Sequence, residues 1–299
     1  MKYYSLLLVA ILSVSTAFSQ TADQVKPALL SDEAFSAVTE FFQYEKSFDL
    51  SARVISRIDS NRYVREKISF DGGKGSRVVG YFAYPKTKLQ KYPVVLLIDG
   101  LTGSKERWFQ WDSWPRGGEM TAALIERGFA VLTLDAPSHG ERSYEYDFGG
   151  IPDLFRNKAW ARDLIVNETI EYMRAIDYVC SRTDVDNNRI GAMGHSLGGL
   201  VSFNLAALDK RIKVAVPMVT PLMTISPAIY VGNFAKRTAD IPILVLMGDK
   251  DWAYSINDAK QMFSTIPSKT KHIILYDLEH RLPLVYVNDA AEWIAKYLK

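Results

Sequence analysis

From about residue 90 onward, the sequence alternates short, continuously apolar runs with longer stretches of helical periodicity. Strands without polar alternation are buried on both faces, and intervening helices join such strands as parallel crossovers. The pattern therefore predicts an α/β fold, with a mostly parallel central sheet and helices on both faces. The predicted strands are residues 94–98, 130–134, 190–193, 214–219, 243–247 and 273–276, and the predicted helices are 119–127, 157–182, 197–208, 255–263 and 284–298.

The segment before this alternation predicts antiparallel strands. Residues 63–70 and 77–84 are rich in β-forming residues and flank Asp71-Gly72-Gly73-Lys74-Gly75, a turn typical of a β-hairpin. We therefore expect an antiparallel hairpin at one edge of the sheet. Two further segments are assigned roles: residues 20–60 as an N-terminal leader with a short helix at 32–44, and residues 221–240 as a small lid.

The first 19 residues have the features of a secretory signal peptide. Lys2 precedes an apolar stretch of about 13 residues, which ends in Ala17-Phe18-Ser19, with small residues at the positions that precede a cut. This stretch is shorter than the ~20 residues that span a bilayer, so an anchor is disfavoured. We expect residues 20–299 to form a single domain, secreted or periplasmic and without membrane insertion.

Composition excludes several classes of partner and site. Lys plus Arg total 36 and Asp plus Glu total 34, so net charge gives no reason to expect nucleic acid or an anionic membrane. Cys180 is the only cysteine and falls on a helical apolar stripe, which predicts buried packing. The four histidines form no ligand cluster, so the sequence implies no metal and no organic cofactor.

Residues 189–200, RIGAMGHSLGGL, place a serine directly between a predicted strand and a predicted helix. Gly194-His195-Ser196-Leu197-Gly198 has the form G-x-S-x-G, in which a sharp turn exposes the hydroxyl and the helix aims its first N–H groups at the site. Such a short pattern also occurs by chance, but a strand before it and a helix after it are the expected context. We therefore predict that Ser196 is a nucleophile.

A serine nucleophile needs a base, and the four histidines are the candidates. His195 adjoins Ser196 and is expected to point to the opposite side, and His272 begins a strand at the far edge of the sheet. His139 and His280 both follow strand ends. The chain order Ser, acid, His favours His280 and leaves His139 a turn-stabilising role.

The remaining groups of such a site are also expected at strand ends. Asp249 and Asp251 both follow the strand at 243–247, and either carboxylate could orient the imidazole. Two backbone N–H groups must bind the oxyanion. Leu197 would supply one from the helix start, and Leu101 the other from the loop after the first parallel strand.

Taken together, these residues resemble the α/β-hydrolase superfamily, in particular its dienelactone-hydrolase-like serine esterase branch. The resemblance covers residues 77–299 and implies hydrolysis of a small-molecule carboxylic ester through an acyl-enzyme. It also implies Asp251 as the acid, three residues after the strand-end Gly248. The stretches that carry it are 94–101, 134–142, 186–199, 248–251 and His280.

Two positions depart from this pattern. Dienelactone hydrolase itself has a cysteine nucleophile where this chain has Ser196. Relatives often carry His-Gly where this chain has Asp99-Gly100. A carboxylate facing the site would oppose a developing oxyanion, so we expect Asp99 to turn away and hydrogen-bond loop backbone.

Aromatic residues near these loops suggest a substrate wall. Trp108 and Trp111 lie in a segment that also carries charged and amide side chains, and Trp252 adjoins the predicted acid. Core packing is the alternative interpretation of these rings. As a substrate wall, with help from Tyr144, Tyr146 and Phe148, they would favour a short acyl group such as acetyl on a carbohydrate or aromatic alcohol.

Two other functions are compatible with the fold. A peptidase of the same fold would usually need an added propeller or a substantial lid. A non-catalytic binding protein on this scaffold would not be expected to keep the serine, acid and histidine in order.

Overall fold

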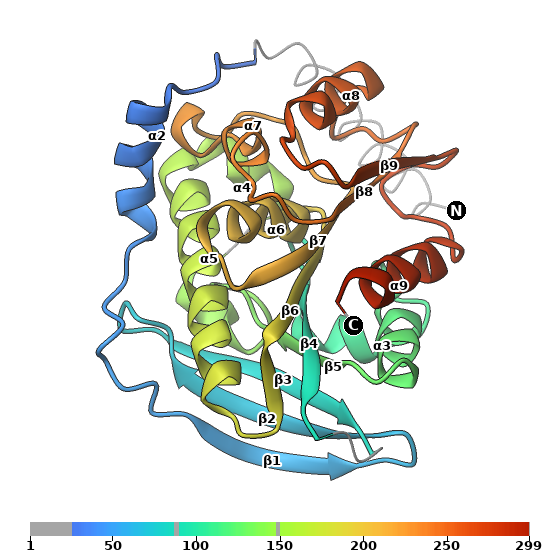
Figure 1. Ribbon diagram of the computed structural model, residues 1–299. Helices are drawn as coiled ribbons and strands as arrows, with labels where there is room; N and C mark the ends of the chain where they lie inside the picture. Colours follow the sequence, from blue (N-terminus) through green and yellow to red (C-terminus); the bar gives the residue numbers. More distant parts are fainter. Residues whose placement is uncertain (1–25, 87–89, 148–149, 299) are drawn as a thin grey trace, which may run out of the picture.

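The computed structural model of the chain describes residues 26–86, 90–147 and 150–298. The predicted signal peptide, residues 1–19, lies outside them. Within the described part, the strands form one sheet in the order β1-β2-β3-β5-β4-β6-β7-β8-β9 (Figure 1). The strands are β1 Arg53–Asp59, β2 Tyr63–Asp71, β3 Arg77–Pro85, β4 Tyr92–Ile98, β5 Ala130–Leu134, β6 Val185–His195, β7 Ile212–Met218, β8 Ile243–Gly248 and β9 Lys271–Tyr276.

Helices cover both faces of this sheet. Figure 1 shows α3 and α9 together on one face, with α5 and α6 on the other. None of the described helices is long and apolar enough to cross a membrane. The α-helices are α2 Asp32–Thr39, α3 Gly117–Glu126, α4 Ile151–Arg156, α5 Lys158–Ser181, α6 Leu197–Leu208, α7 Val231–Ala235, α8 Ile256–Thr265 and α9 Tyr286–Tyr297, and the 3₁₀ helices are η1 Glu40–Phe42, η2 Lys105–Phe109, η3 Gly140–Glu145 and η4 Pro227–Ile229.

The central strand β4 shows why its sequence is continuously apolar. All seven of its residues are buried. Val94 and Leu96 belong to a hydrophobic cluster on one face, and Val95 and Leu97 belong to a cluster on the other. From β5 through β9 the strands pair in parallel, which confirms the predicted sheet.

The N-terminal hairpin is present and has one more strand than predicted. β2 and β3 pair antiparallel, and β3 then pairs antiparallel with β5. β1 adds a further antiparallel strand at the outer edge, within the segment predicted as a leader. Every residue of β1 is exposed, so the strand lacks the apolar alternation by which a sequence signals a half-buried strand.

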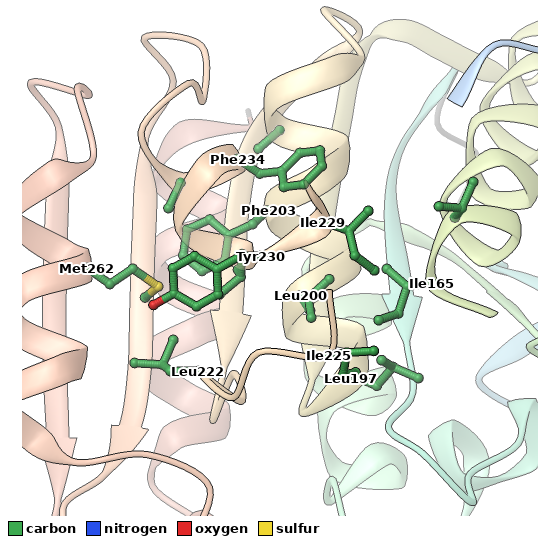
Figure 2. Close-up of a cluster of buried hydrophobic side chains, with 14 of the residues drawn as sticks. Ile165, Leu197, Leu200, Phe203, Leu222, Ile225, Ile229, Tyr230, Phe234 and Met262 are labelled. Atoms are coloured by element: carbon green, nitrogen blue, oxygen red, sulfur yellow. The ribbon is translucent and has the colours of Figure 1, made fainter. Parts of the chain in front are cut away.

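The predicted helix at 32–44 is shorter in the structure. Ser31 caps α2 by accepting a hydrogen bond from the Ala34 N–H at 3.2 Å, and the helix passes into η1 after Thr39. The segment 221–240, predicted as a lid, contains η4 and α7. Its apolar side chains Ile229, Tyr230 and Phe234 are buried in the cluster shown in Figure 2.

One buried hydroxyl joins the long helix α5 to the sheet. The Tyr172 hydroxyl donates to the Leu97 carbonyl at 2.9 Å and accepts from the Leu134 N–H at 3.2 Å. Burial raises the pKa of Tyr172 well above its usual value, so the donor proton is retained. The hydroxyl therefore links the ends of β4 and β5, the two strands that lead into loops at the site.

Tyr172→Phe tests this link. We expect it to lower the free energy of unfolding by about 1–3 kcal/mol, because the backbone N–H of Leu134 loses a buried partner. Tyr144→Phe is the matched control, since Tyr144 is 79% exposed. Urea unfolding of both variants measures the difference, and equal stabilities would contradict the structural role of Tyr172.

Candidate active site

Ser196 lies in the turn that joins β6 to α6, and its backbone conformation is unusual. Its φ is +60° and its ψ is −117°, a region that non-glycine residues rarely occupy. A Cβ at position 194 would lie 2.0 Å from the Gly198 carbonyl oxygen, and one at 198 would lie 2.2 Å from the Ile98 carbonyl oxygen. The two glycines thus allow the strand and helix to approach closely around the serine.

Three side chains predicted from the sequence form a continuous hydrogen-bonded chain. The Ser196 Oγ lies 2.8 Å from His280 Nε2, and His280 Nδ1 lies 2.8 Å from Asp251 Oδ2. They come from the β6–α6 turn and from the loops after β8 and β9, so only the fold brings them together. Asp251 and His280 are both buried.

Asp251 is held in place by its own loop. Its Oδ1 accepts a hydrogen bond from the Ala253 N–H at 2.9 Å. The Tyr254 hydroxyl accepts from the Gly248 N–H at 2.9 Å, and burial together with the Asp251 charge raises the pKa of Tyr254. Its proton is therefore retained beside the carboxylate. Sequence reasoning missed Tyr254, although its position three residues after the acid was a usable signal.

His195 supports the base, a role that the sequence did not indicate. Its Nε2 lies 3.2 Å from the His280 carbonyl oxygen, and the two rings are 5.4 Å apart. Burial, with the nearby His280, lowers the pKa of His195 well below its usual value. The ring is therefore neutral, and an Nε2–H can donate to the His280 carbonyl. His195 contacts His280, contrary to the expectation that it would point to the opposite side.

The other candidates for the base and the acid do not contact Ser196 or His280. His139 is buried with its Nδ1 2.8 Å from the Pro137 carbonyl oxygen, within its own turn. His272 is exposed at the start of β9. Asp249 is exposed, and its N–H donates to the Tyr276 carbonyl at 2.9 Å. Of the two candidate acids, only Asp251 reaches His280.

The two residues predicted to supply oxyanion N–H groups, Leu101 and Leu197, lie close to Ser196. Leu101 and Leu197 both line the cavity that contains Ser196. A Cβ at position 100 would lie 3.0 Å from the Ser196 Cβ, which shows how closely the loop after β4 approaches the serine. No described residue accepts a hydrogen bond from the N–H of Leu101 or Leu197. Both donors are thus available to an oxyanion.

Asp99 turns away from the serine and holds the loop that carries Leu101. Its Oδ1 accepts from the Gly100 N–H at 2.7 Å, and its Oδ2 accepts from the Ser104 N–H at 3.0 Å. Burial raises the pKa of Asp99 to about 6, while Arg107 and these N–H groups oppose the rise. Asp99 therefore hydrogen-bonds loop backbone and does not face the serine, as expected from the sequence.

Arg107 holds the same loop from outside. Its guanidinium donates to the Thr102 carbonyl at 2.8 Å, and its Nε lies 4.0 Å from Asp99 Oδ2. Thr102 has a φ of +66°, so the loop adopts a strained turn that these contacts maintain. The sequence gave no sign that Arg107 would have this role.

A cavity of about 300 Å³ opens beside Ser196. That volume is at the lower end of the ~300–1,000 Å³ typical of small-molecule sites. Trp252, which is 38% exposed, lines it, and its ring lies 5.1 Å from the His280 ring. Trp114, 50% exposed, and Arg107 also line it. Trp252 therefore stands where the sequence predicted, and Trp114 is an addition.

The prediction that Trp108 contacts substrate is wrong. Its side chain is fully buried in the cluster beneath α3 and α9. Trp111 is 64% exposed but lines a different depression, beside Tyr63. Tyr144 and Tyr146 do not line the cavity, and Phe148 lies outside the described residues.

The misassignment of Trp108 has a physical cause. The polar residues around it were interpreted as a half-exposed rim, but Lys105 is fully buried. Its Nζ lies 2.6 Å from Asp135 Oδ2, 2.6 Å from Glu141 Oε1 and 3.0 Å from Glu106 Oε1. Burial alone would lower the pKa of Lys105, but these carboxylates raise it overall. The charges serve an internal network that ties the loop after β4 to the loop after β5.

The family match and the fold together place the chain among the esterases of the α/β-hydrolase superfamily, as the resemblance predicted. Residues 30–241 match the acetyl xylan esterase (AXE1) family, and the chain belongs to that family. Membership of this family supports the prediction that the protein is a carboxylic ester hydrolase.

Solved structures with the same fold include two acetyl xylan esterases. The enzyme from Paenibacillus sp. R4 is 21% identical with a TM-score of 0.71, covering 94% of this chain and 99% of that one. Acetyl xylan esterase 1 from Thermoanaerobacterium is 18% identical with a TM-score of 0.74, covering 93% and 98%.

Curated relatives match over a shorter span. The putative hydrolase YtaP of Bacillus subtilis is 28% identical over 51% of this chain and 52% of its own length. Cutinase est2 of Thermobifida alba is 26% identical over 64% of this chain and 52% of its own length. The chain thus spans about half the length of these curated relatives.

Asp99→Asn tests the loop support beside Ser196. An amide cannot accept through its nitrogen, so one loop N–H and Arg107 lose their partner and the Leu101 N–H shifts. Removing an oxyanion donor outright costs roughly 10²–10³ in kcat, so we expect a loss of about 10–100-fold in kcat with little change in KM. Asp249→Asn is the control, because Asp249 is an exposed loop aspartate. A kcat within threefold of wild type would contradict this role.

The same variant has a second readout, its stability. Because burial raises the pKa of Asp99 from 3.8 to about 6, ionisation in the folded state is unfavourable. The free energy of unfolding of wild type should therefore fall relative to that of Asp99→Asn as the pH rises from about 4 to about 6. Above about pH 6 the difference between the two proteins should stay constant. Urea titrations across this range measure it.

Proposed function

We propose that this chain is a serine hydrolase that cleaves carboxylic esters through an acyl-enzyme. The observation that carries this proposal is the hydrogen-bonded chain from Ser196 through His280 to Asp251, with 2.8 Å at each step. Family membership supports the ester as substrate, because the family is that of acetyl xylan esterases.

The first half-reaction forms the acyl-enzyme. Ser196 Oγ attacks the ester carbonyl carbon while its proton passes to His280 Nε2. The oxyanion that forms accepts hydrogen bonds from the Leu101 and Leu197 N–H groups. When the carbon–oxygen bond to the alcohol breaks, the proton on His280 goes to the departing alcohol oxygen. Asp251 stabilises the imidazolium throughout.

The second half-reaction returns the enzyme to its starting state. Water attacks the acyl carbonyl and gives one proton to His280 Nε2. The bond between the acyl carbon and Ser196 Oγ then breaks, and His280 returns the proton to the serine. A carboxylic acid leaves, and no other reactant is required.

We assign the alcohol half of the substrate to the rim formed by Trp114 and Trp252. His280 must protonate the departing alcohol oxygen, so the alcohol lies on the side where Trp252 contacts His280. Half-exposed aromatic rings suit a carbohydrate ring or an aromatic alcohol. In the proposed substrate wall, Trp252 stays as predicted and Trp114 takes the place of Trp108 and Trp111.

We further propose that the mature protein is secreted or periplasmic. The basis is the N-terminal sequence, with Lys2, an apolar stretch and Ala17-Phe18-Ser19. An exported enzyme would meet carbohydrate or aryl esters outside the cytoplasm, which fits the alcohol proposed above.

Ser196→Ala tests the nucleophile. We expect a loss on the order of 10³-fold or more in kcat with aryl acetates, because the attacking oxygen is removed. A fluorophosphonate probe should label wild type and the control Ser264→Ala, an exposed serine on α8, but not Ser196→Ala. Absence of labelling in wild type would favour a binding protein. Faster turnover of aminoacyl amides than of esters would favour a peptidase.

Asp251→Asn and Asp249→Asn form a matched pair for the acid. Asn at 251 removes the negative charge beside the imidazolium and disfavours the correct His280 tautomer, so we expect a loss of about 10³–10⁴-fold in kcat. Asp249 is exposed and makes no contact with His280, so its variant should keep wild-type activity within about twofold. Steady-state kinetics on one aryl acetate compares them, and a larger loss from Asp249→Asn would reverse the assignment.

A further inference from the structure

A second depression in the surface lies beside the cavity that contains Ser196, and part of its lining is aromatic. Its volume is about 290 Å³. It is formed by the turn between β1 and β2, by α3 and by the end of η2 with the residues after it. Three of the lining residues carry aromatic rings and three carry polar groups that the argument below uses: Tyr63, Phe109 and Trp111, and Asn61, Arg62 and Glu126.

The segment from residue 107 to residue 114 separates the two hollows. Arg107 and Trp114 line the cavity at Ser196, whereas Phe109 and Trp111 line the second depression. Three residues of chain span at most about 11 Å, so the Cα atoms of Trp111 and Trp114 lie no farther apart than that. An elongated ligand can therefore reach from one hollow to the other across this short segment.

Trp111 presents an open aromatic surface in the second depression. Its side chain is 64% exposed. Phe109, by contrast, packs against Tyr63 and Tyr81 with ring centroids 5.9 Å and 5.5 Å away, and the Arg65 guanidinium lies 4.8 Å from its ring. These contacts fix the Phe109 ring and leave Trp111 as the ring most open to a ligand. A broad, rigid indole suits the flat C–H face of a sugar ring.

The loop that carries Trp111 is held in place by its neighbours. The Ser113 hydroxyl donates to the Arg107 carbonyl at 2.8 Å. The Arg281 guanidinium donates to the Asp112 carbonyl, also at 2.8 Å. The residues on both sides of Asp112 are thus tied to the body of the molecule. Because the loop is already ordered, less conformational entropy is lost when a ligand binds to the Trp111 ring.

The polar groups of the depression favour a neutral ligand rich in hydroxyls. Arg62 Nη1 lies 3.8 Å from Glu126 Oε1, and the two side chains are 63% and 64% exposed. Because these charges are opposite, the pair gives no net charge that would select an ion. Asn61 is also exposed, and its amide can both donate and accept. Sugar hydroxyls likewise donate and accept, whereas a hydrocarbon would leave these groups without partners.

We propose that the second depression binds the carbohydrate part of the substrate, one or more sugar units away from the ester that Ser196 attacks. This inference rests on the proposed function, in which the alcohol is a carbohydrate that contacts Trp114. From Trp114 the carbohydrate chain passes over the 107–114 segment, and a sugar ring stacks on Trp111. Asn61, with the Arg62–Glu126 pair, binds its hydroxyls. The site increases the affinity for long substrates and takes no part in bond cleavage.

Trp111→Ala tests the site with acetylated oligosaccharides of xylose, glucose and mannose, each from one to six sugar units long. In wild type, KM should fall about tenfold along at least one series, because only a long chain reaches Trp111. The substitution should abolish this fall and leave kcat within about twofold, since it removes binding that is equal in the ground and transition states. Hydrolysis of 4-nitrophenyl acetate, which is too short to reach Trp111, should also stay within about twofold.

Two further variants control this experiment. Tyr144→Ala is the matched control, because Tyr144 is 79% exposed and lines neither hollow. Ala122→Phe fills the depression from α3 and leaves the Trp111 loop unchanged, so it should also abolish the dependence of KM on chain length. A folded Trp111→Ala or Ala122→Phe variant that keeps the wild-type dependence would overturn the proposal. A wild-type KM that is independent of length in all three series would overturn it too.

Direct binding separates this proposal from the proposed function. Calorimetry with Ser196→Ala, which cannot form an acyl-enzyme, measures the Kd of the six-unit acetylated oligosaccharides. We expect the Kd to rise at least about fivefold when Trp111→Ala is added. An equal Kd would overturn the carbohydrate site even if wild type hydrolyses esters. Absence of Ser196-dependent hydrolysis of every ester would instead refute the proposed function.

A second copy of this chain is the competing occupant of the depression. Sedimentation of wild type and Trp111→Ala distinguishes the two possibilities. We expect both proteins to have the same oligomeric state, because the site binds carbohydrate. A dimer that Trp111→Ala dissociates, with unchanged kinetics on the oligosaccharides, would assign the depression to self-association and overturn the proposal.

Discussion

The close approach of β6 and α6 around Ser196 is the constraint on which the site depends. Glycines at 194 and 198 remove the side chains that would keep the strand and helix apart, and the serine is held at a φ of +60°. This turn exposes the hydroxyl and directs the first N–H group of α6 to the same point. The strain is tolerated because the end of β6 and most of α6 are buried, which holds both elements in place.

Around this fixed point, buried polar contacts position the loops. His195, neutral because it is buried, supports the backbone of His280. Asp99 and Arg107 hold the loop that supplies the second oxyanion donor, and Lys105 joins that loop to the one after β5. These charges lie close to the serine but hydrogen-bond backbone or one another, so the cavity itself stays mostly apolar. Apolar walls lower the local dielectric and so strengthen the electrostatic contacts that act on the reacting ester.

Much of the site could be predicted because its reactive residues lie in short segments at strand ends, where local sequence patterns identify them. Gly194 to Gly198 specify the turn, and the order of serine, acid and base singled out His280. The choice of Asp251 over Asp249 needed the resemblance, because two carboxylates two residues apart look alike in sequence. Trp108 was misjudged for a related reason: charged neighbours such as Lys105 usually indicate exposure, and here they are buried in an ion network.

The sequence by itself determined the parallel sheet and the identities of Ser196 and His280, because apolar periodicity and local turn chemistry are properties of short segments. Only the tertiary structure decided that His195 supports the base. The same is true of the ion pair by which Lys105 joins the loops after β4 and β5. These features join residues far apart in the chain, and β1 shows the same limit, since an exposed strand pairs through backbone groups that every residue carries.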